Sequence, residues 1–165
     1  MASCNFSVDI EAPVETVWLL TQSPARRPEW DFRIVKAELV DAIAPQKGAK
    51  FRSIGRMFGS FQLDMEYVTV EPNQRSAVRL VASKGIPFKS GGGSWHYKDL
   101  GNGRSRFSTN IRMYTNRSWF GNMADRYILE PFLKWMTIKS LKKLKAVAEA
   151  DYQNLNDNGM PVRKI

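Results

Sequence analysis

The segment 129–152, LEPFLKWMTIKSLKKLKAVAEADY, decides the fold class of this chain. Its apolar residues recur three or four positions apart and form one broad stripe, with lysines beside and opposite it. From Asp125 to Tyr152 there is no glycine, and the only proline, Pro131, falls in the first turns. The pattern predicts an amphipathic helix of about 25 residues and about 38 Å. Clustered Asn, Asp and Gly then predict a polar, mobile tail over 153–165, after a single domain over 1–152.

The chain ahead of this helix consists of short segments in which apolar and polar residues alternate. Between residues 34 and 114 these segments are separated by turns, one of them at 58–61, and by a bend flanked by 85–87 and the glycines 91–93. They predict an antiparallel meander with one face in water. A further strand is expected over 5–10. A short helix should then start near Pro13 and be broken by the prolines of 23–28.

Two stretches of the chain carry a family resemblance. Phe6–Pro13, with Val17-Trp18 behind it and Trp30 ahead of a strand, resembles the opening of the START-like (SRPBCC) superfamily. Within it the chain is most similar to the polyketide cyclase/dehydrase and lipid-transport branch. Ser140–Lys145, followed by Glu149, is similar to that branch's last helix. The resemblance covers residues 4–150.

The resemblance implies an α+β helix-grip fold. A curved antiparallel sheet of about six or seven strands would wrap around the long C-terminal helix, with short helices after the first strand. An apolar cavity would lie between sheet and helix. Members bind lipids, sterols, polyketides, quinones or plant hormones, and a minority catalyse cyclisation or dehydration. The superfamily has no universal catalytic motif, so the resemblance transfers no catalytic residue.

Composition excludes several classes of protein. One cysteine, Cys4, excludes an internal disulfide framework, and with one histidine, His96, it excludes a Cys/His zinc cluster. No apolar run reaches the ~18 residues that span a bilayer, and residues 1–5 lack the layout of a secretory signal. We therefore expect a cytoplasmic protein without a metal or cofactor.

The net charge of +9 is concentrated in residues 50–117, which hold 12 basic and 4 acidic side chains. Such an excess could attract anionic lipid or nucleic acid, or simply aid solubility. The chain has no nucleic-acid motif and no row of exposed aromatic residues, so nucleic acid is the weakest of these readings. Five lysines of the helix could contact an anionic membrane: Lys134, Lys139, Lys142, Lys143 and Lys145.

Catalytic candidates are few. Strand alternation places His96 opposite Trp95 and Tyr97, so we expect His96 in water rather than in a site. Asp64 and Glu66 are expected to pair with basic side chains on neighbouring strands. We therefore predict no catalytic residue.

The predicted inner faces are apolar with a few polar groups. We expect these residues to line a ligand cavity: Phe51, Met57, Leu63, Met65, Tyr67, Leu80, Trp95, Tyr97, Phe107, Thr109, Ile111, Met113, Phe132 and Met136. Apolar walls with sparse hydroxyls, including that of Ser53, are typical of small-molecule pockets, although a filled core looks the same in sequence.

We therefore predict binding or transfer of a small hydrophobic ligand, such as a lipid, polyketide or quinone. The alternative is a polyketide cyclase/dehydrase-type enzyme, in which Tyr67, Tyr97 or Arg112 would polarise a carbonyl. Alternation points Arg112 outward, which weakens it in that role. The ligand and the oligomeric state are left open.

Overall fold

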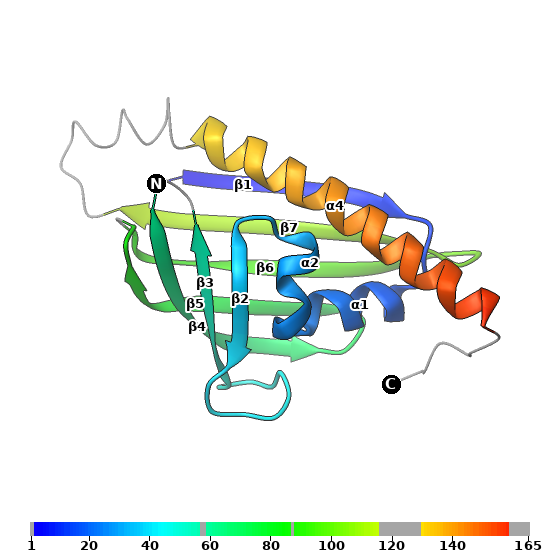
Figure 1. The fold of residues 1–165 in the computed structure, drawn as a ribbon, viewed down its shortest axis with the longest axis horizontal. Coiled ribbons are helices and arrows are strands. Elements are labelled where there is room, and N and C mark those ends of the chain that lie inside the picture. The colour runs from blue at the N-terminus through cyan, green and yellow to red at the C-terminus, as the bar shows by residue number, and fades with distance from the viewer. Residues whose placement is uncertain (1, 57–58, 87, 116–129, 159–165) are drawn as a thin grey trace.

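A seven-stranded antiparallel sheet curls into a half-barrel around a long helix (Figure 1). The computed structural model describes residues 2–56, 59–86, 88–115 and 130–158. The elements are β1 (Ala2–Ile10), α1 (Val14–Gln22), η1 (Pro24–Arg26), α2 (Arg27–Trp30), β2 (Ile34–Leu39), β3 (Lys50–Arg56), β4 (Ser60–Glu71), β5 (Arg75–Lys84), β6 (Phe88–Gly101), β7 (Arg104–Thr115) and α4 (Glu130–Asp157). The strand order is β1-β7-β6-β5-β4-β3-β2. The predicted α+β helix-grip fold is confirmed.

The long C-terminal helix is present, with one difference at its end. Residues 125–129 of the predicted helix lie outside the described residues, and α4 is described from Glu130. It continues to Asp157, past Gln153, where we expected the tail. Between Pro131 and Gly159 there is no glycine or proline, so no helix-breaking residue ends the helix earlier. No helix in the described part of the chain is long and apolar enough to cross a membrane.

The first strand and the helix after it form as predicted. Strand β1 pairs with β7 along its whole length. Pro13 caps α1, and its carbonyl accepts hydrogen bonds from the backbone N–H groups of Thr16 (3.1 Å) and Val17 (3.3 Å). The prolines that follow shorten the next helices, η1 and α2, to three and four residues.

The glycine run 91–93 lies inside β6 rather than beside a bend. A Cβ atom on Gly92 would approach the carbonyl oxygen of Val78 to 2.4 Å, and one on Gly91 that of Arg112 to the same distance. Glycine at these two positions therefore lets the backbones of β5 and β7 approach β6 closely. Of the predicted turn at 58–61, Ser60 and Phe61 belong to β4, and Phe58 lies outside the described residues.

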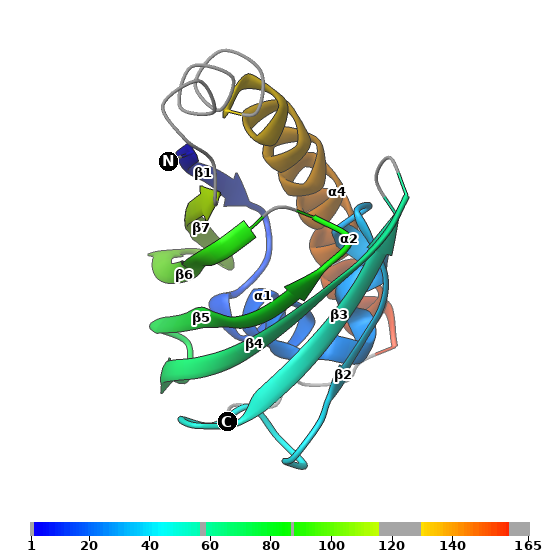
Figure 2. The same cartoon turned by 90° about the vertical axis from the view of Figure 1, so that its left-hand side faces the viewer.

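Strands β5 and β6 are paired over only part of their length. Their ladder runs from Arg75 opposite His96 to Arg79 opposite Gly92. Beyond it β5 pairs with β4 alone and β6 with β7 alone. The sheet thus consists of two wings, β2–β5 and β6–β7–β1, joined by one short ladder (Figure 2).

The main core fills one end of the concave face. There the C-terminal half of α4, through Leu141, Leu144 and Ala148, belongs to one buried cluster with Tyr97 and Phe107. Helix α1 adds buried side chains to the same cluster, which include Val17, Trp18 and Leu20. The N-terminal half of α4 contributes Leu133 and Met136 to a separate, smaller cluster.

Candidate functional site

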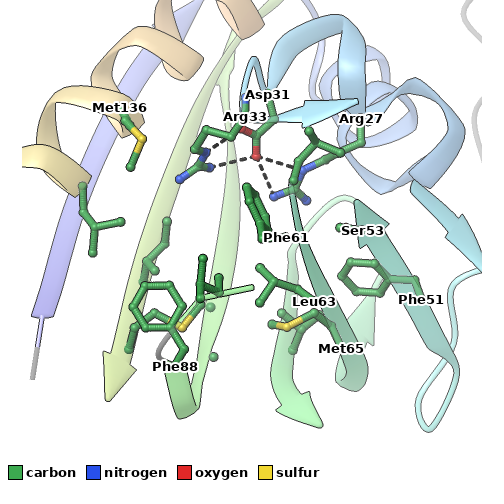
Figure 3. Close-up of a pocket in the computed structure, with 18 of the residues that line it drawn as sticks. Arg27, Asp31, Arg33, Phe51, Ser53, Phe61, Leu63, Met65, Phe88 and Met136 are labelled. Atoms are coloured by element: carbon green, nitrogen blue, oxygen red, sulfur yellow. Dashed lines mark hydrogen bonds and ion pairs between the residues drawn. The ribbon is translucent and has the colours of Figure 1, made fainter. Parts of the chain in front are cut away.

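A cavity of about 100 Å³ lies between the sheet and the N-terminal half of α4 (Figure 3). Its wall is mainly apolar, with a cluster of three charged residues at one end. The lining residues are Arg27, Asp31, Arg33, Ile34, Phe51, Ser53, Phe61, Leu63, Met65, Val78, Ile86, Phe88, Gly92, Gly93, Trp95, Ile111, Met113, Leu133 and Met136.

The residues predicted to line a cavity divide into two groups. Those that line it are Phe51, Leu63, Met65, Trp95, Ile111, Met113 and Met136. Those placed elsewhere are Tyr67, Leu80, Tyr97, Phe107, Thr109 and Phe132, while Met57 lies outside the described residues. Phe51, Met65 and Trp95 also belong to the main core cluster, so the cavity borders that core. That a ligand occupies the cavity stays a prediction.

Gly93 leaves space in the wall of the cavity. It pairs with Val78 on β5 and with Ile111 on β7, and both partners line the cavity. Directly paired residues point to the same face of a sheet, so a side chain at Gly93 would point into the cavity. A Cβ atom there would meet a single neighbour, the carbonyl oxygen of Asn110 at 3.4 Å.

The charged cluster lies where α2 joins β2. Asp31 is 1% exposed and lies between the guanidinium groups of Arg27 and Arg33. Arg33 donates from Nε to Oδ1 (2.6 Å) and from Nη2 to Oδ2 (2.8 Å). Arg27 donates from Nε (3.2 Å) and Nη2 (3.1 Å) to Oδ2. Burial alone would raise the pKa of Asp31, but the two guanidinium groups outweigh it and hold the pKa well below its usual range.

The buried tyrosines are protonated at neutral pH. The Tyr97 hydroxyl lies 2.7 Å from Thr21 Oγ1 and accepts a hydrogen bond from Gln22 Nε2 (2.6 Å). Burial raises the pKa of Tyr97, although these hydrogen bonds oppose the shift. Burial likewise raises the pKa of Tyr67 to about 12. Neither ring lines the cavity.

The side chains expected on the outer face are found there. His96 and Arg112 are exposed. Asp64 accepts hydrogen bonds from Arg52 on β3, and Glu66 from Arg79 on β5. The predicted cross-strand pairs are confirmed.

Most of the lysines on α4 already have partners. Lys134 pairs with Glu130 (2.9 Å) and Lys145 with Glu149 (3.3 Å), while Lys143 donates to the carbonyl oxygen of Pro28 (3.3 Å). Lys139 Nζ lies 4.7 Å from the ring centroid of Phe32 and 5.3 Å from that of Trp135. Trp135 and Ile138 are exposed by 54% and 41%. The outer face of the N-terminal half of α4 therefore carries both basic and apolar side chains.

Sequence reasoning missed two features of the cavity. Arg27 and Asp31 stand four positions apart, a spacing typical of helical ion pairs, and this spacing was the signal available for the charged cluster. Phe61 lies in β4, although we assigned it to the turn at 58–61, and Phe88 lies at the start of β6, next to the segment 85–87 that we placed beside a bend. No alternation marks Phe88 as part of the inner face, whereas Phe61 continues the alternation of Leu63, Met65 and Tyr67, and this was the signal available for it.

Comparison with solved structures supports the fold at low sequence identity. A START superfamily protein from Mycobacterium smegmatis superposes with a TM-score of 0.66 at 14% identity, over 94% of this chain and 99% of the other. The ZhuI aromatase/cyclase from Streptomyces sp. R1128 superposes with a TM-score of 0.70 at 15% identity, over 89% and 93%. At these identities the likeness establishes the fold.

Sequence comparison adds a relative and a family. A Bacillus subtilis (strain 168) protein named "uncharacterized membrane protein YndG" is 23% identical over 154 residues, which are 86% of this chain and 55% of that protein. The chain thus spans about half the length of this relative. The sequence profile of the family "Polyketide cyclase / dehydrase and lipid transport" matches residues 1–149, nearly the whole domain. The chain therefore belongs to the polyketide cyclase/dehydrase and lipid-transport family.

Proposed function

We propose that the chain binds a small hydrophobic molecule in the cavity between the sheet and α4, and carries it without converting it. The observation that supports this most directly is the cavity's wall, which is mainly apolar, with Ser53 and the cluster of Arg27, Asp31 and Arg33 as its polar side chains. Apolar walls with a few converging polar groups are typical of small-molecule sites. Gly93 supports the proposal as well, because any larger residue there would fill the space.

The size of the cavity limits what it holds in this conformation. Its volume of about 100 Å³ is below the ~300–1,000 Å³ typical of pockets for drug-sized ligands. It accommodates a small ring or one end of a longer molecule. Met65, Met113 and Met136 all line it, and methionine side chains adapt to the shape of a ligand more readily than branched ones. A larger ligand would enter by repacking these side chains.

The enzymatic alternative has less support from the geometry. Tyr67 and Tyr97 lie outside the cavity wall, and Arg112 is on the outer face. Asp31 is the carboxylate that lines the cavity, and both of its oxygens accept hydrogen bonds from the two arginines. A carboxylate held ionised in this way is a weak proton acceptor.

The test compares a cavity-filling variant with a matched control on the next residue. Gly93→Leu places four carbon atoms in the cavity, whereas Ser94→Leu places the same group on the opposite face of β6. We expect the wild type and Ser94→Leu to bind the neutral fluorophore 1-aminoanthracene, and Gly93→Leu to bind it at least tenfold more weakly. Native mass spectrometry of freshly purified wild type would identify a bound molecule. Equal binding by both variants, or no binding by the wild type, would contradict the proposal.

We also propose that an anionic membrane is where the ligand is exchanged. The support is the outer face of α4, where Trp135 and Ile138 are exposed beside Lys139 and Lys142. Aromatic and basic side chains together are typical of surfaces that bind anionic lipid, at about 1 kcal/mol per basic group. Wild type should sediment with phosphatidylserine-containing vesicles at low salt, and Trp135→Ser should reduce this. Equal sedimentation with pure phosphatidylcholine vesicles would refute the proposal.

A further inference from the structure

The charged cluster at the end of the cavity has more positive than negative charge. Arg27 and Arg33 contribute two positive charges and Asp31 one negative charge, which leaves a formal excess of one. The side chains of Arg27 and Arg33 are only 16% and 15% exposed. Burying a charge costs free energy unless a partner compensates it. One arginine would be enough to neutralise Asp31, so the second is a surplus cation in the wall of an apolar cavity.

Asp31 has no hydrogen-bonding capacity left for a ligand. Besides the four bonds from the two guanidinium groups, its Oδ1 accepts from the backbone N–H of Arg33 (3.4 Å) and from Ser140 Oγ on α4 (3.2 Å). These contacts fix the carboxylate, and with it the orientation of both arginines. Asp31 therefore acts as a positioning residue.

The arginines, in contrast, keep donors that no described residue accepts. Each guanidinium group has five N–H bonds and gives two of them, one from Nε and one from Nη2, to Asp31. Within the described residues, Nη1 of Arg27 and Nη1 of Arg33 have no hydrogen-bond acceptor. Arg27 is also held in place by aromatic rings, since its Cζ lies 4.4 Å from the Trp30 centroid and 5.1 Å from that of Trp95.

We propose that the ligand is an apolar molecule ending in a single carboxylate, which binds the free N–H groups of Arg27 and Arg33 while its apolar part fills the cavity. This inference rests on the proposed ligand-binding function and specifies its substrate class. Guanidinium groups suit planar oxyanions, and one negative charge would balance the excess of one. A doubly charged phosphate monoester would replace a buried positive excess with a negative one.

The first experiment varies only the charge of the ligand. Octanoate, 1-octanol and octyltrimethylammonium have the same apolar chain and are anionic, neutral and cationic at pH 7. Each would compete with 1-aminoanthracene for wild-type protein. We expect octanoate to bind at least tenfold more tightly than 1-octanol, and the cation to bind most weakly. If the acid and the alcohol bind equally, the carboxylate inference fails while the proposed function stands. If neither these probes nor the fluorophore bind, the proposed function fails.

The second experiment tests whether the preference for octanoate over 1-octanol depends on the charged cluster. Arg33→Gln removes the surplus charge and leaves Asp31 paired with Arg27. Arg79→Gln is the matched control, because Arg79 is 62% exposed on the outer face. The measured quantity is the ratio of octanoate to 1-octanol affinity, which a general loss of packing would not change selectively. We expect Arg33→Gln to reduce this ratio at least tenfold and Arg79→Gln to keep it. If Arg33→Gln folds and the affinity ratio is unchanged, the assignment of carboxylate binding to these arginines is wrong. If Arg33→Gln does not fold, the comparison of octanoate with 1-octanol on the wild type decides.

Discussion

Replacing Asp31 by asparagine should destabilise the protein more than any other change of a single charge described above. The substitution keeps the size of the side chain but leaves Arg27 and Arg33 without their counter-ion in a site where Asp31 is 1% exposed. Breaking a buried ion pair by removing one partner typically costs about 3–5 kcal/mol. The amide oxygen of asparagine can still accept hydrogen bonds, so we expect the lower end, about 3 kcal/mol at pH 7.

This loss is measurable by ordinary unfolding experiments. A domain of this size loses about 2–4 °C of Tm per kcal/mol, so Asp31→Asn should lower Tm by about 6–12 °C. Urea unfolding at pH 7 gives the free energy directly. The matched control is Asp64→Asn, which breaks a pair with Arg52 on the solvent side of the sheet. Exposed pairs contribute about 0–1 kcal/mol, so the control should lie in that range.

The pH dependence of the difference provides an independent check. The folded-state pKa of Asp31 is below its unfolded value, so the unfolded chain takes up the proton first as the pH falls. The stabilisation by Asp31 is therefore complete above the unfolded pKa of about 3.9 and is lost as the pH falls toward the folded pKa. The difference in free energy of unfolding between wild type and Asp31→Asn should therefore shrink progressively as the pH falls below about 4. The reasoning would be refuted if Asp31→Asn lowered the free energy of unfolding by less than about 1 kcal/mol at pH 7. It would also be refuted if the difference in stability between the two proteins did not change with pH.

Four further substitutions test the placement of side chains. His96→Gln, on the outer face, should change the free energy of unfolding by less than about 0.5 kcal/mol and leave 1-aminoanthracene binding intact; a tenfold loss of binding would contradict that placement. Thr109→Trp should cost about 1–3 kcal/mol, because Thr109 is buried outside the cavity and the indole has no space; an unchanged Tm would place the cavity beside it. Gly92→Ala should destabilise the fold and Gly93→Ala should not, since only the first brings a Cβ against the Val78 carbonyl; equal melting temperatures would be inconsistent with this geometry.

The secondary structure could be predicted because its signals are local, whereas the wrapping of the sheet around the long helix was implied by the family resemblance. The stripe over 129–152 repeats with the period of a helix, and the alternation in β4, β6 and β7 repeats with that of a strand. Trp95 and Tyr97 were correctly placed opposite His96 for the same reason. A side chain's face follows from its neighbours in sequence, and no long-range information is needed.

The cavity could be predicted only in part, because alternation gives the face of a side chain but not what lies across from it. Tyr97 and Ile111 are both on the inner face, yet Tyr97 packs within the main core and Ile111 lines the cavity. The two residues differ in which part of α4 lies across from them, and this depends on how the helix crosses the sheet. The charged cluster depends in the same way on Ser140, which lies 109 positions from Asp31 in the sequence.

The short ladder between β5 and β6 has a mechanical consequence. Past Arg79 and Gly92 the two wings share no backbone hydrogen bonds of that ladder, but the hydroxyl of Ser83 on β5 donates a hydrogen bond to the carbonyl oxygen of Phe88 on β6. Ile86 and Phe88 line the cavity from this unpaired stretch, and Gly91 adds no side chain to it. On this side of the cavity the wings are therefore joined by a side-chain hydrogen bond rather than by a ladder. Loss of that bond would let the wings separate beside the cavity while every strand ladder stays intact.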